Sequence, residues 1–192
     1  AVETVLVHRR EAEAILPRLL RSLENAGVTV KGCERSRELV GRSAPEVGST
    51  KDGSKNGGPG ISVATEEDWA TEYLDMVVSL RIVDDLDQAV EHINTYGSHH
   101  TDGIVTSDAE RAGVFMDRVD SASVMWNAST RFADGYRYGL GAEIGISTSK
   151  IHARGPVGLE GVVTYKWRLE GGGHIVADYT GDGARRFTHR PL

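Results

Sequence analysis

The sequence has little cysteine, no excess of positive charge and no long apolar run. Its single cysteine, Cys33, excludes a disulfide within the chain and favours a reducing compartment. The 22 Lys and Arg residues are outnumbered by 28 Asp and Glu, so the clustered basic face typical of nucleic-acid binding is not expected. No apolar stretch approaches the roughly 20 residues that span a bilayer, and the opening residues do not form a signal peptide. We therefore expect a cytoplasmic protein that binds neither nucleic acid nor membrane.

The lone cysteine is also a poor candidate for a nucleophile. Cys33 is followed by Glu34 and Arg35, and no histidine that could hold a thiolate lies nearby in the sequence. We interpret Cys33 as a surface or edge thiol.

Strand-like and helix-like segments alternate along most of the chain. Short β-branched or alternating runs predict strands, and apolar residues three or four positions apart predict helices. The predicted strands are 3–8, 28–30, 76–83, 104–105 and 122–126, with helices after the first, third and fourth. Pro17 fits poorly inside the first helix, where it should start the regular part or kink it. This alternation predicts an α/β fold, with a mostly parallel sheet and flanking helices, over residues 1–158.

Residues 41–65 differ in composition from the rest of this region. Small and polar residues dominate, with a Gly-Gly-Pro-Gly run at 57–60. Such a segment buries too little apolar area to offset the entropy lost on ordering. We interpret 41–65 as a flexible surface insertion.

The segment that follows the last predicted strand is the best candidate for a site. Residues 127–160 contain six glycines, and loops after strands are where α/β proteins carry their sites. Asparagine and serine donate hydrogen bonds, and arginine can hold a carboxylate or phosphate through two parallel ones. The candidates for an anionic small-molecule substrate are Asn127, Ser129, Thr130, Arg131, Arg137 and Arg154. A purely structural loop is the alternative.

Two further patterns favour structural roles. The glycines at 139, 141 and 145 do not have the Gly-x-Gly-x-x-Gly spacing of a dinucleotide-binding turn. His99 and His100 are adjacent, and neighbouring side chains on a strand point to opposite faces, so both cannot easily ligate one ion. We predict no metal site.

The end of the chain, residues 159–192, predicts a hairpin and a tail. Segments 161–169 and 174–179 have the composition of two strands joined around three glycines at 171–173. An isolated hairpin is marginal in water. We therefore expect it to pair with another part of the protein or with a second subunit, in a dimer or a larger homo-oligomer.

Several segments resemble one enzyme family. They are 1–8, 94–106, 126–132 (Trp-Asn-Ala-Ser-Thr-Arg-Phe), 139–148 and 151–160. They are spread over nearly the whole chain outside 41–65 and resemble the C-terminal part of gamma-glutamyl phosphate reductases. These enzymes, also called glutamate-5-semialdehyde dehydrogenases, belong to the aldehyde dehydrogenase superfamily. The resemblance implies an aldehyde dehydrogenase-like catalytic domain with a C-terminal oligomerisation hairpin.

The resemblance also implies a reaction. In the family, a cysteine thiolate attacks L-glutamyl 5-phosphate and displaces phosphate, and NADPH then delivers the hydride that yields L-glutamate 5-semialdehyde for proline biosynthesis. The family's nucleophile lies just before the segment that begins here at Ala1, and its cofactor domain precedes that. We expect no catalytic residue in this chain and no activity from residues 1–192 alone.

The resemblance gives some residues an expected role. Asn127, Ser129, Thr130 and Arg131 match the family signature and would line the substrate pocket, with Arg131 at an anionic end of the substrate. Arg137 and Arg154 are weaker candidates for the same role. Glu72 matches, loosely, the superfamily glutamate that holds the nicotinamide ribose. The match is loose because residues 74–76 are Leu-Asp-Met where the superfamily has Phe-Gly-Pro.

Three interpretations remain open at the sequence level. The chain is part of a single-activity reductase, part of a bifunctional pyrroline-5-carboxylate synthase, or a non-catalytic α/β module used in binding or assembly. Residues upstream of Ala1 would separate the first two. The polar, arginine-bearing loop at 127–132 argues against the third, because assembly alone would not require it.

Overall fold

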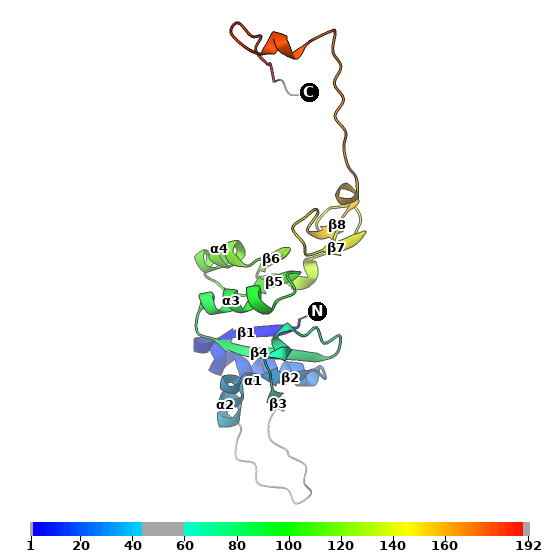
Figure 1. Cartoon of the computed structure of the whole chain (residues 1–192). Helices are drawn as coiled ribbons and strands as arrows, with labels where there is room; N and C mark the ends of the chain where they lie inside the picture. The colour runs from blue at the N-terminus through cyan, green and yellow to red at the C-terminus, as the bar shows by residue number, and fades with distance from the viewer. Residues whose placement is uncertain (1, 44–59, 190–192) are drawn as a thin grey trace, which may run out of the picture. The chain divides into compact units, whose positions relative to one another are not determined.

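A computed structural model describes residues 2–43 and 60–189 (Figure 1). The chain divides into two compact units, Ala1–Val162 and Val163–Leu192. Each unit is described by itself.

The first unit is built on a parallel sheet of four strands. The strands are β1 (Thr4–His8), β2 (Thr29–Gly32), β3 (Ile61–Val63) and β4 (Val77–Val83). Their order is β1-β4-β2-β3, and all neighbours run parallel. The inner strand β4 is largely buried, as expected for a strand of a parallel sheet with both faces covered.

Helices α1 (Arg9–Asn25) and α2 (Glu34–Ser43) lie together on one side of this sheet (Figure 1). In α1 the residues at i, i+4 and i+8, Ala12, Leu16 and Leu20, are buried. They form a core with apolar side chains of the strands, including Leu80, which is fully buried. The helix predicted after the first strand is therefore present, and its apolar face packs against the sheet.

Pro17 lies inside α1, two turns after the helix begins. The prediction that it starts the regular part of the helix is therefore wrong. Because proline has no N–H, it cannot donate to the carbonyl of Glu13, one turn earlier. Packing of Leu16 and Leu20 against the sheet keeps the segment helical.

A second layer follows β4. It contains α3 (Leu86–Tyr96), β5 (Thr101–Ile104), α4 (Ala109–Arg118) and β6 (Ser123–Trp126), and β5 pairs with β6 in parallel. Asp85 and Asp108 cap the two helices by accepting hydrogen bonds from the backbone N–H groups of Gln88 and Arg111. A second core is formed by Val90, Phe115 and Val119. The predicted α/β class is confirmed.

The glycine-rich region after β6 contains more regular structure than its composition predicted. Strands β7 (Gly145–Ser147) and β8 (Gly155–Val157) pair antiparallel, and 3₁₀ turns span Thr130–Phe132 and Leu159–Val162. Strands of three residues are too short to produce a periodic pattern, so the sequence could not indicate them.

The proposed insertion at 41–65 is ordered at both ends. Helix α2 continues to Ser43, and β3 pairs with β2 and packs Ile61 against the core. The prediction of a flexible segment is wrong at these ends, because β3 completes the sheet edge next to β2. Residues 44–59 lie outside the described residues.

The second unit corrects the predicted hairpin. The described part of Val163–Leu192 contains no strand, and its regular element is a 3₁₀ turn, Val176–Tyr179. Tyr165, Trp167 and Leu169 are 80%, 89% and 95% exposed. No described residue buries this alternating apolar pattern, and two strands alone are marginal. Among the described residues, no helix has both the length and the apolar character required to cross a membrane.

Candidate functional site

The loop that follows β6 is fastened to the loop that follows β5. Asn127 adopts a left-handed backbone conformation (φ 51°), and its N–H donates to the carbonyl of Ile104. Its side-chain Oδ1 accepts from the N–H of Thr106 at 3.0 Å, and its Nδ2 donates to the Thr106 carbonyl at 2.9 Å. Both ends of the Asn127 amide are thus used to join the carboxyl ends of β5 and β6.

Ser129 begins the 3₁₀ turn at Thr130–Phe132. Its Oγ accepts from the N–H of Arg131 at 3.3 Å, and its carbonyl accepts from Phe132. The Ser129 hydroxyl proton is still available to a ligand, because this bond uses the oxygen as an acceptor. Thr130 is half-buried.

Arg131 is the exposed cation of this loop. Its guanidinium makes no hydrogen bond or ion pair with any residue of 2–43 or 60–189, whereas its backbone N–H and carbonyl are both bonded. A free guanidinium on an ordered loop can donate hydrogen bonds to a carboxylate or phosphate without first breaking another contact.

Arg137 lies beside Arg131 but is already engaged. Its Nη1 donates to the carbonyl of Arg131 at 2.9 Å and to Oδ2 of Asp134 at 3.1 Å. The structure therefore brings Arg131 and Arg137 together, with only the first guanidinium free.

Arg154 lies elsewhere. Its Nη1 and Nη2 donate to the carboxylate and carbonyl of Asp120 at 2.9 and 3.0 Å, and its Nε donates to Thr148. Lys150 Nζ contacts the second oxygen of Asp120 at 2.6 Å. Lys150, followed by Arg154, lowers the pKa of the Asp120 carboxyl. Asp120 precedes β6 and Arg131 follows it, so Arg154 is held at the opposite end of that strand.

Glu72 lies in the segment that leads into β4 and is exposed. The next residue, Tyr73, donates its N–H to Glu3 Oε2 at 3.3 Å, and the Glu3 carbonyl accepts from Ser79. Glu72 is therefore at the amino ends of β1 and β4. The Glu72 carboxylate has no hydrogen bond or ion pair within the described parts of the chain.

A buried polar cluster holds this segment, and the sequence did not reveal it. Asp68 accepts from Lys31 Nζ at 2.6 Å, from the Thr65 N–H at 2.7 Å and from the Tyr73 hydroxyl at 3.0 Å. The hydrogen bond from Lys31 is the main reason that the pKa of Asp68 lies far below its usual range. The bonds to Tyr73 hold the residue next to Glu72. Because Lys31 and Asp68 are 37 positions apart, no local pattern could have indicated their pairing.

The other polar residues singled out in the sequence have structural partners. His99 contacts the carbonyl of Asp120 at 2.8 Å, and His100 contacts the Thr101 hydroxyl at 2.6 Å. Cys33 is half-buried at the end of β2, where its Sγ accepts the N–H of Ile82 at 3.4 Å. Within the described ranges, no group of three or more His, Cys, Asp or Glu residues could hold a metal ion.

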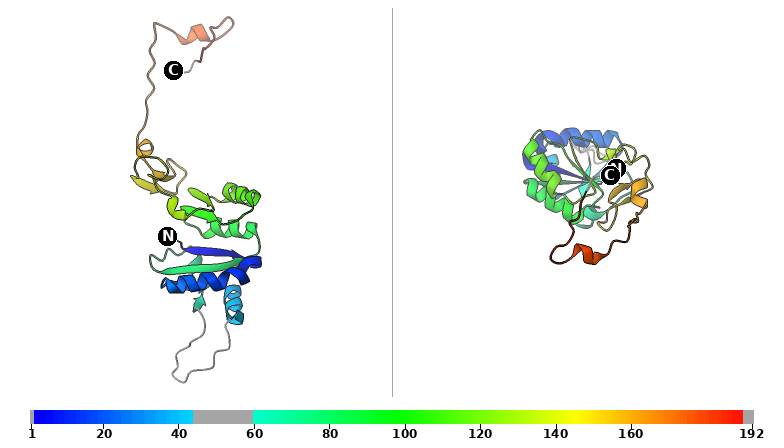
Figure 2. Two further views of the ribbon diagram at one scale, coloured as in Figure 1. Left: turned by 180° about the vertical axis from the view of Figure 1, so that it is seen from behind. Right: turned by 90° about the horizontal axis from the view of Figure 1, so that it is seen from above.

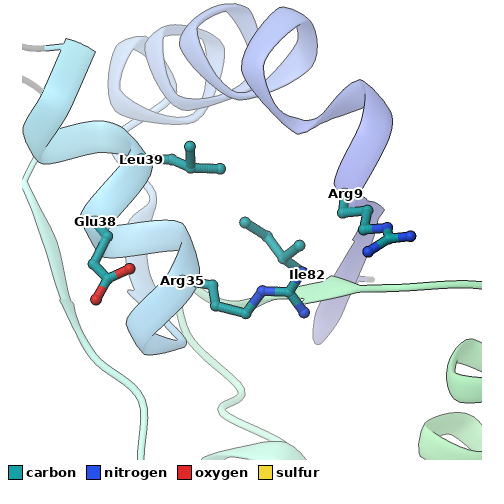
Figure 3. Close-up of a pocket in the computed structure, with 5 residues that line it drawn as sticks. All are labelled: Arg9, Arg35, Glu38, Leu39 and Ile82. Carbon is teal, nitrogen blue, oxygen red and sulfur yellow. The ribbon is translucent and has the colours of Figure 1, made fainter.

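A shallow pocket at the carboxyl ends of β1, β2 and β4 contains two arginines that both lie near one carboxylate (Figure 3). It is lined by Arg9, Arg35, Glu38, Leu39 and Ile82. Arg35 donates to Asp84 at 2.8 Å, and Arg9 lies 3.8 Å from the same carboxylate oxygen. Because the carboxylate of Asp84 already lies near both arginines, the loop after β6, with a guanidinium that has no such partner, is the better candidate for an anion site.

The loop after β6 and the amino end of β1 lie on the same side of the first unit. Both the front view and the view from behind show this arrangement (Figures 1 and 2). The loop that carries Arg131 therefore lies on the side of the unit at which β1 begins.

Comparison with known proteins finds similar sequences and a similar solved structure, although no protein-family model matches the chain. The chain is 53% identical, over all 192 residues, to gamma-glutamyl phosphate reductase of Pelotomaculum thermopropionicum, and 51% identical to that of Methanosarcina barkeri. It spans 40% of the length of each of these relatives. The crystal structure of gamma-glutamyl phosphate reductase from Thermotoga maritima has a TM-score of 0.78 and 42% identity. That match covers 90% of this chain and 37% of the Thermotoga chain.

Proposed function

We propose that this chain, which is homologous along its entire length to gamma-glutamyl phosphate reductases, forms the substrate-binding wall of such an enzyme. The reaction converts L-glutamyl 5-phosphate, NADPH and a proton to L-glutamate 5-semialdehyde, NADP⁺ and phosphate, in the cytoplasm, as a step of proline biosynthesis. The observation that carries the proposal is the free guanidinium of Arg131, on an internally bonded loop on the side at which β1 begins.

The anionic substrate suits this loop. L-Glutamyl 5-phosphate has an α-carboxylate and a phosphate, and Arg131 can bind one of them through two parallel hydrogen bonds. The hydroxyl of Ser129 can donate a further hydrogen bond, and Thr130 is the next residue, at the start of the 3₁₀ turn. Asn127 supports the site indirectly, because its side-chain amide fixes the loop to the backbone of Thr106.

The nucleophile belongs to the segment that, in the proposed enzyme, precedes β1. Its thiolate adds to the acyl carbonyl of the substrate, the bond from carbon to the phosphate oxygen breaks, and phosphate leaves. The loop and the amino end of β1 lie on one side of the unit (Figure 1), which supports the proposal that Arg131 holds the substrate near that segment. Fixed positioning of this kind contributes to the rate because the loop does not have to be ordered in each turnover.

The cofactor would meet this chain at Glu72. NADPH, when bound, supplies the hydride that reduces the acyl group to the aldehyde. The exposed carboxylate of Glu72 can accept hydrogen bonds from two ribose hydroxyls, and the network of Asp68 and Tyr73 holds the neighbouring backbone. This assignment explains why an exposed glutamate lies on an otherwise firmly bonded segment.

The second unit is proposed to pair with another copy of the chain. Tyr165, Trp167 and Leu169 expose a stripe of large apolar side chains that monomeric proteins rarely leave in water. Replacement of Trp167 by Asp should shift the mass measured by light scattering towards that of the monomer. An unchanged mass would contradict a role for this stripe in assembly.

A chimera tests the proposed function. This chain would replace the matching 40% of the Pelotomaculum reductase, with the remainder supplied by that relative. Oxidation of glutamate 5-semialdehyde in the presence of phosphate and NADP⁺, followed by absorbance of NADPH, reports the reverse reaction. We expect turnover within about tenfold of the parent, and none from residues 1–192 alone. A folded chimera without activity, beside an active parent, would refute the proposal.

A further inference from the structure

Arg137 closes a turn that ends on the backbone of Arg131. Asp134 Oδ1 accepts from the N–H groups of Tyr136 and Arg137 at 2.9 and 3.2 Å. Its Oδ2 accepts from Arg137 Nη1, and the same nitrogen donates to the carbonyl of Arg131. The guanidinium of Arg137 therefore joins a carboxylate three residues earlier to a carbonyl six residues earlier.

Both polar groups of the Arg131 backbone are held by side chains. Ser129 Oγ accepts its N–H at 3.3 Å, and Arg137 donates to its carbonyl at 2.9 Å. With both peptide groups held, the direction of the Arg131 Cα–Cβ bond is set, while its guanidinium keeps all its donors for a ligand.

The turn at residues 134–138 is also fixed to other parts of the first unit. Tyr138 donates its hydroxyl proton to Ser123 Oγ, on β6, at 2.8 Å. Gly135 is buried, and its N–H donates to Glu143 Oε2 at 2.8 Å. A Cβ on Gly135 would lie 2.3 Å from the carbonyl of Ala142. Movement of the turn is therefore restricted on both sides of Arg137.

We infer that Arg137 is a positioning residue, which sets the direction of Arg131 towards the anionic substrate and does not itself bind it. The inference rests on the proposed function, because it requires Arg131 to be the anion-binding group. It assigns different roles to two neighbouring arginines of the same loop.

The chain offers a matched control. Arg111 forms the same local unit with Asp108: its N–H donates to Asp108 Oδ1 at 3.1 Å, and its Nε lies 3.1 Å from Asp108 Oδ2. Both pairs are separated by three residues and are exposed. Arg111 lies on α4, and the structure gives it no bond to the backbone of a substrate-binding residue.

The test is a double-mutant cycle in the chimera. Arg131→Ala, Arg137→Ala, the double variant, Arg137→Lys and Arg111→Ala are compared for KM and kcat with glutamate 5-semialdehyde. We expect Arg137→Ala to raise KM about three- to tenfold with kcat within about twofold. In the Arg131→Ala background, Arg137→Ala should raise KM by less than a further factor of about two. Arg137 acts only by positioning Arg131, so its removal has little further effect once the Arg131 side chain is absent. Arg137→Lys should recover part of the affinity, and Arg111→Ala should leave KM unchanged.

Each contrary result has a distinct meaning. If Arg137→Ala raises KM by the same factor with or without Arg131, Arg137 binds the substrate directly and the inference is wrong. If Arg137→Ala leaves KM unchanged, the turn does not direct Arg131 and the inference is also wrong. If Arg131→Ala itself has no effect, the proposed binding role of Arg131 fails first, and the inference fails with it. Circular dichroism of each variant, with Arg137→Lys as the milder change, separates these results from a loss of folding.

Discussion

The guanidinium of Arg154 and the carboxylate of Asp120 fasten the β7–β8 turn to the segment before β6. Nη1 of Arg154 lies 2.9 Å from Oδ1 of Asp120, Nη2 lies 3.0 Å from the Asp120 carbonyl, and Lys150 takes the second carboxylate oxygen. An arginine that the sequence placed among the candidate substrate ligands is thus engaged in holding two loops together.

Removal of this pair should loosen the β7–β8 turn locally. We expect Arg154→Ala to raise amide hydrogen exchange across 145–157 about tenfold, because the turn loses three hydrogen bonds to Asp120 and Thr148. The control is Arg168→Ala, which removes an exposed ion pair with Glu170 in the second unit. Equal exchange across 145–157 in both variants would show that the pair does not hold the turn.

Arg131 should determine substrate affinity. Arg131→Ala in the chimera should raise the KM for the anionic substrate at least roughly tenfold, which corresponds to about 1.4 kcal/mol for a lost charge-assisted contact. Steady-state kinetics measures this change. An unchanged KM would exclude Arg131 from the binding site.

The buried carboxylate of Asp68 should contribute strongly to stability. Asp68→Ala leaves Lys31, Thr65 and Tyr73 without their shared acceptor, and we expect a loss of about 2–4 kcal/mol. Denaturant unfolding measures the change, and Asp108→Ala, at an exposed helix cap, serves as a milder comparison. The folded pKa of Asp68 is depressed, so its contribution to stability is fully present above the unfolded pKa and is lost progressively as the pH falls from the unfolded pKa towards the lower folded pKa. Equal losses in both variants would argue against the network.

His92 should make the fold sensitive to mild acid. It is 5% exposed, and burial, followed by the nearby charge of Arg81, lowers its pKa from 6.5 to about 4. Arg81 Nη1 lies 3.0 Å from His92 Nδ1, which places the ring proton on Nε2, an atom with no partner among the described residues. A proton added at Nδ1 would face the Arg81 guanidinium. His92 also packs against the ring of Trp69, with 5.5 Å between ring centroids.

The direction of the pH effect follows from the protonation of His92 in the folded and the unfolded chain. Above pH 6.5 the His92 ring is mostly neutral in both states, so this group does not change the stability of the fold. As pH falls from about 6.5 to about 4, the unfolded chain binds the proton first, so stability decreases by up to roughly 3 kcal/mol. Thermal unfolding of His92→Phe should show a smaller decrease over the same interval than the parent chain. Parallel pH profiles of the two proteins would show that His92 is not responsible.

Much of the fold follows from local pattern. The apolar face of α1 and the buried run of β4 are visible in the sequence because burial of a helix or strand repeats with the period of that element. The glycine-rich stretch after β6 likewise indicated where a loop would carry polar groups. The predicted hairpin at 161–179 failed because the same alternating pattern does not show which surface will bury it.

The sequence by itself therefore determined the α/β class, the main helices and the loop that contains Arg131. The tertiary structure decided which of the polar residues in that region remain free. The Asn127 side chain is hydrogen-bonded to Thr106, 21 positions away, and the Arg154 side chain to Asp120, 34 positions away. Such pairs depend on strand register and on how helices pack, and neither is encoded in the local spacing of charges. These contacts engage Asn127 and Arg154, whereas the guanidinium of Arg131 has no partner among the described residues and remains available for a ligand.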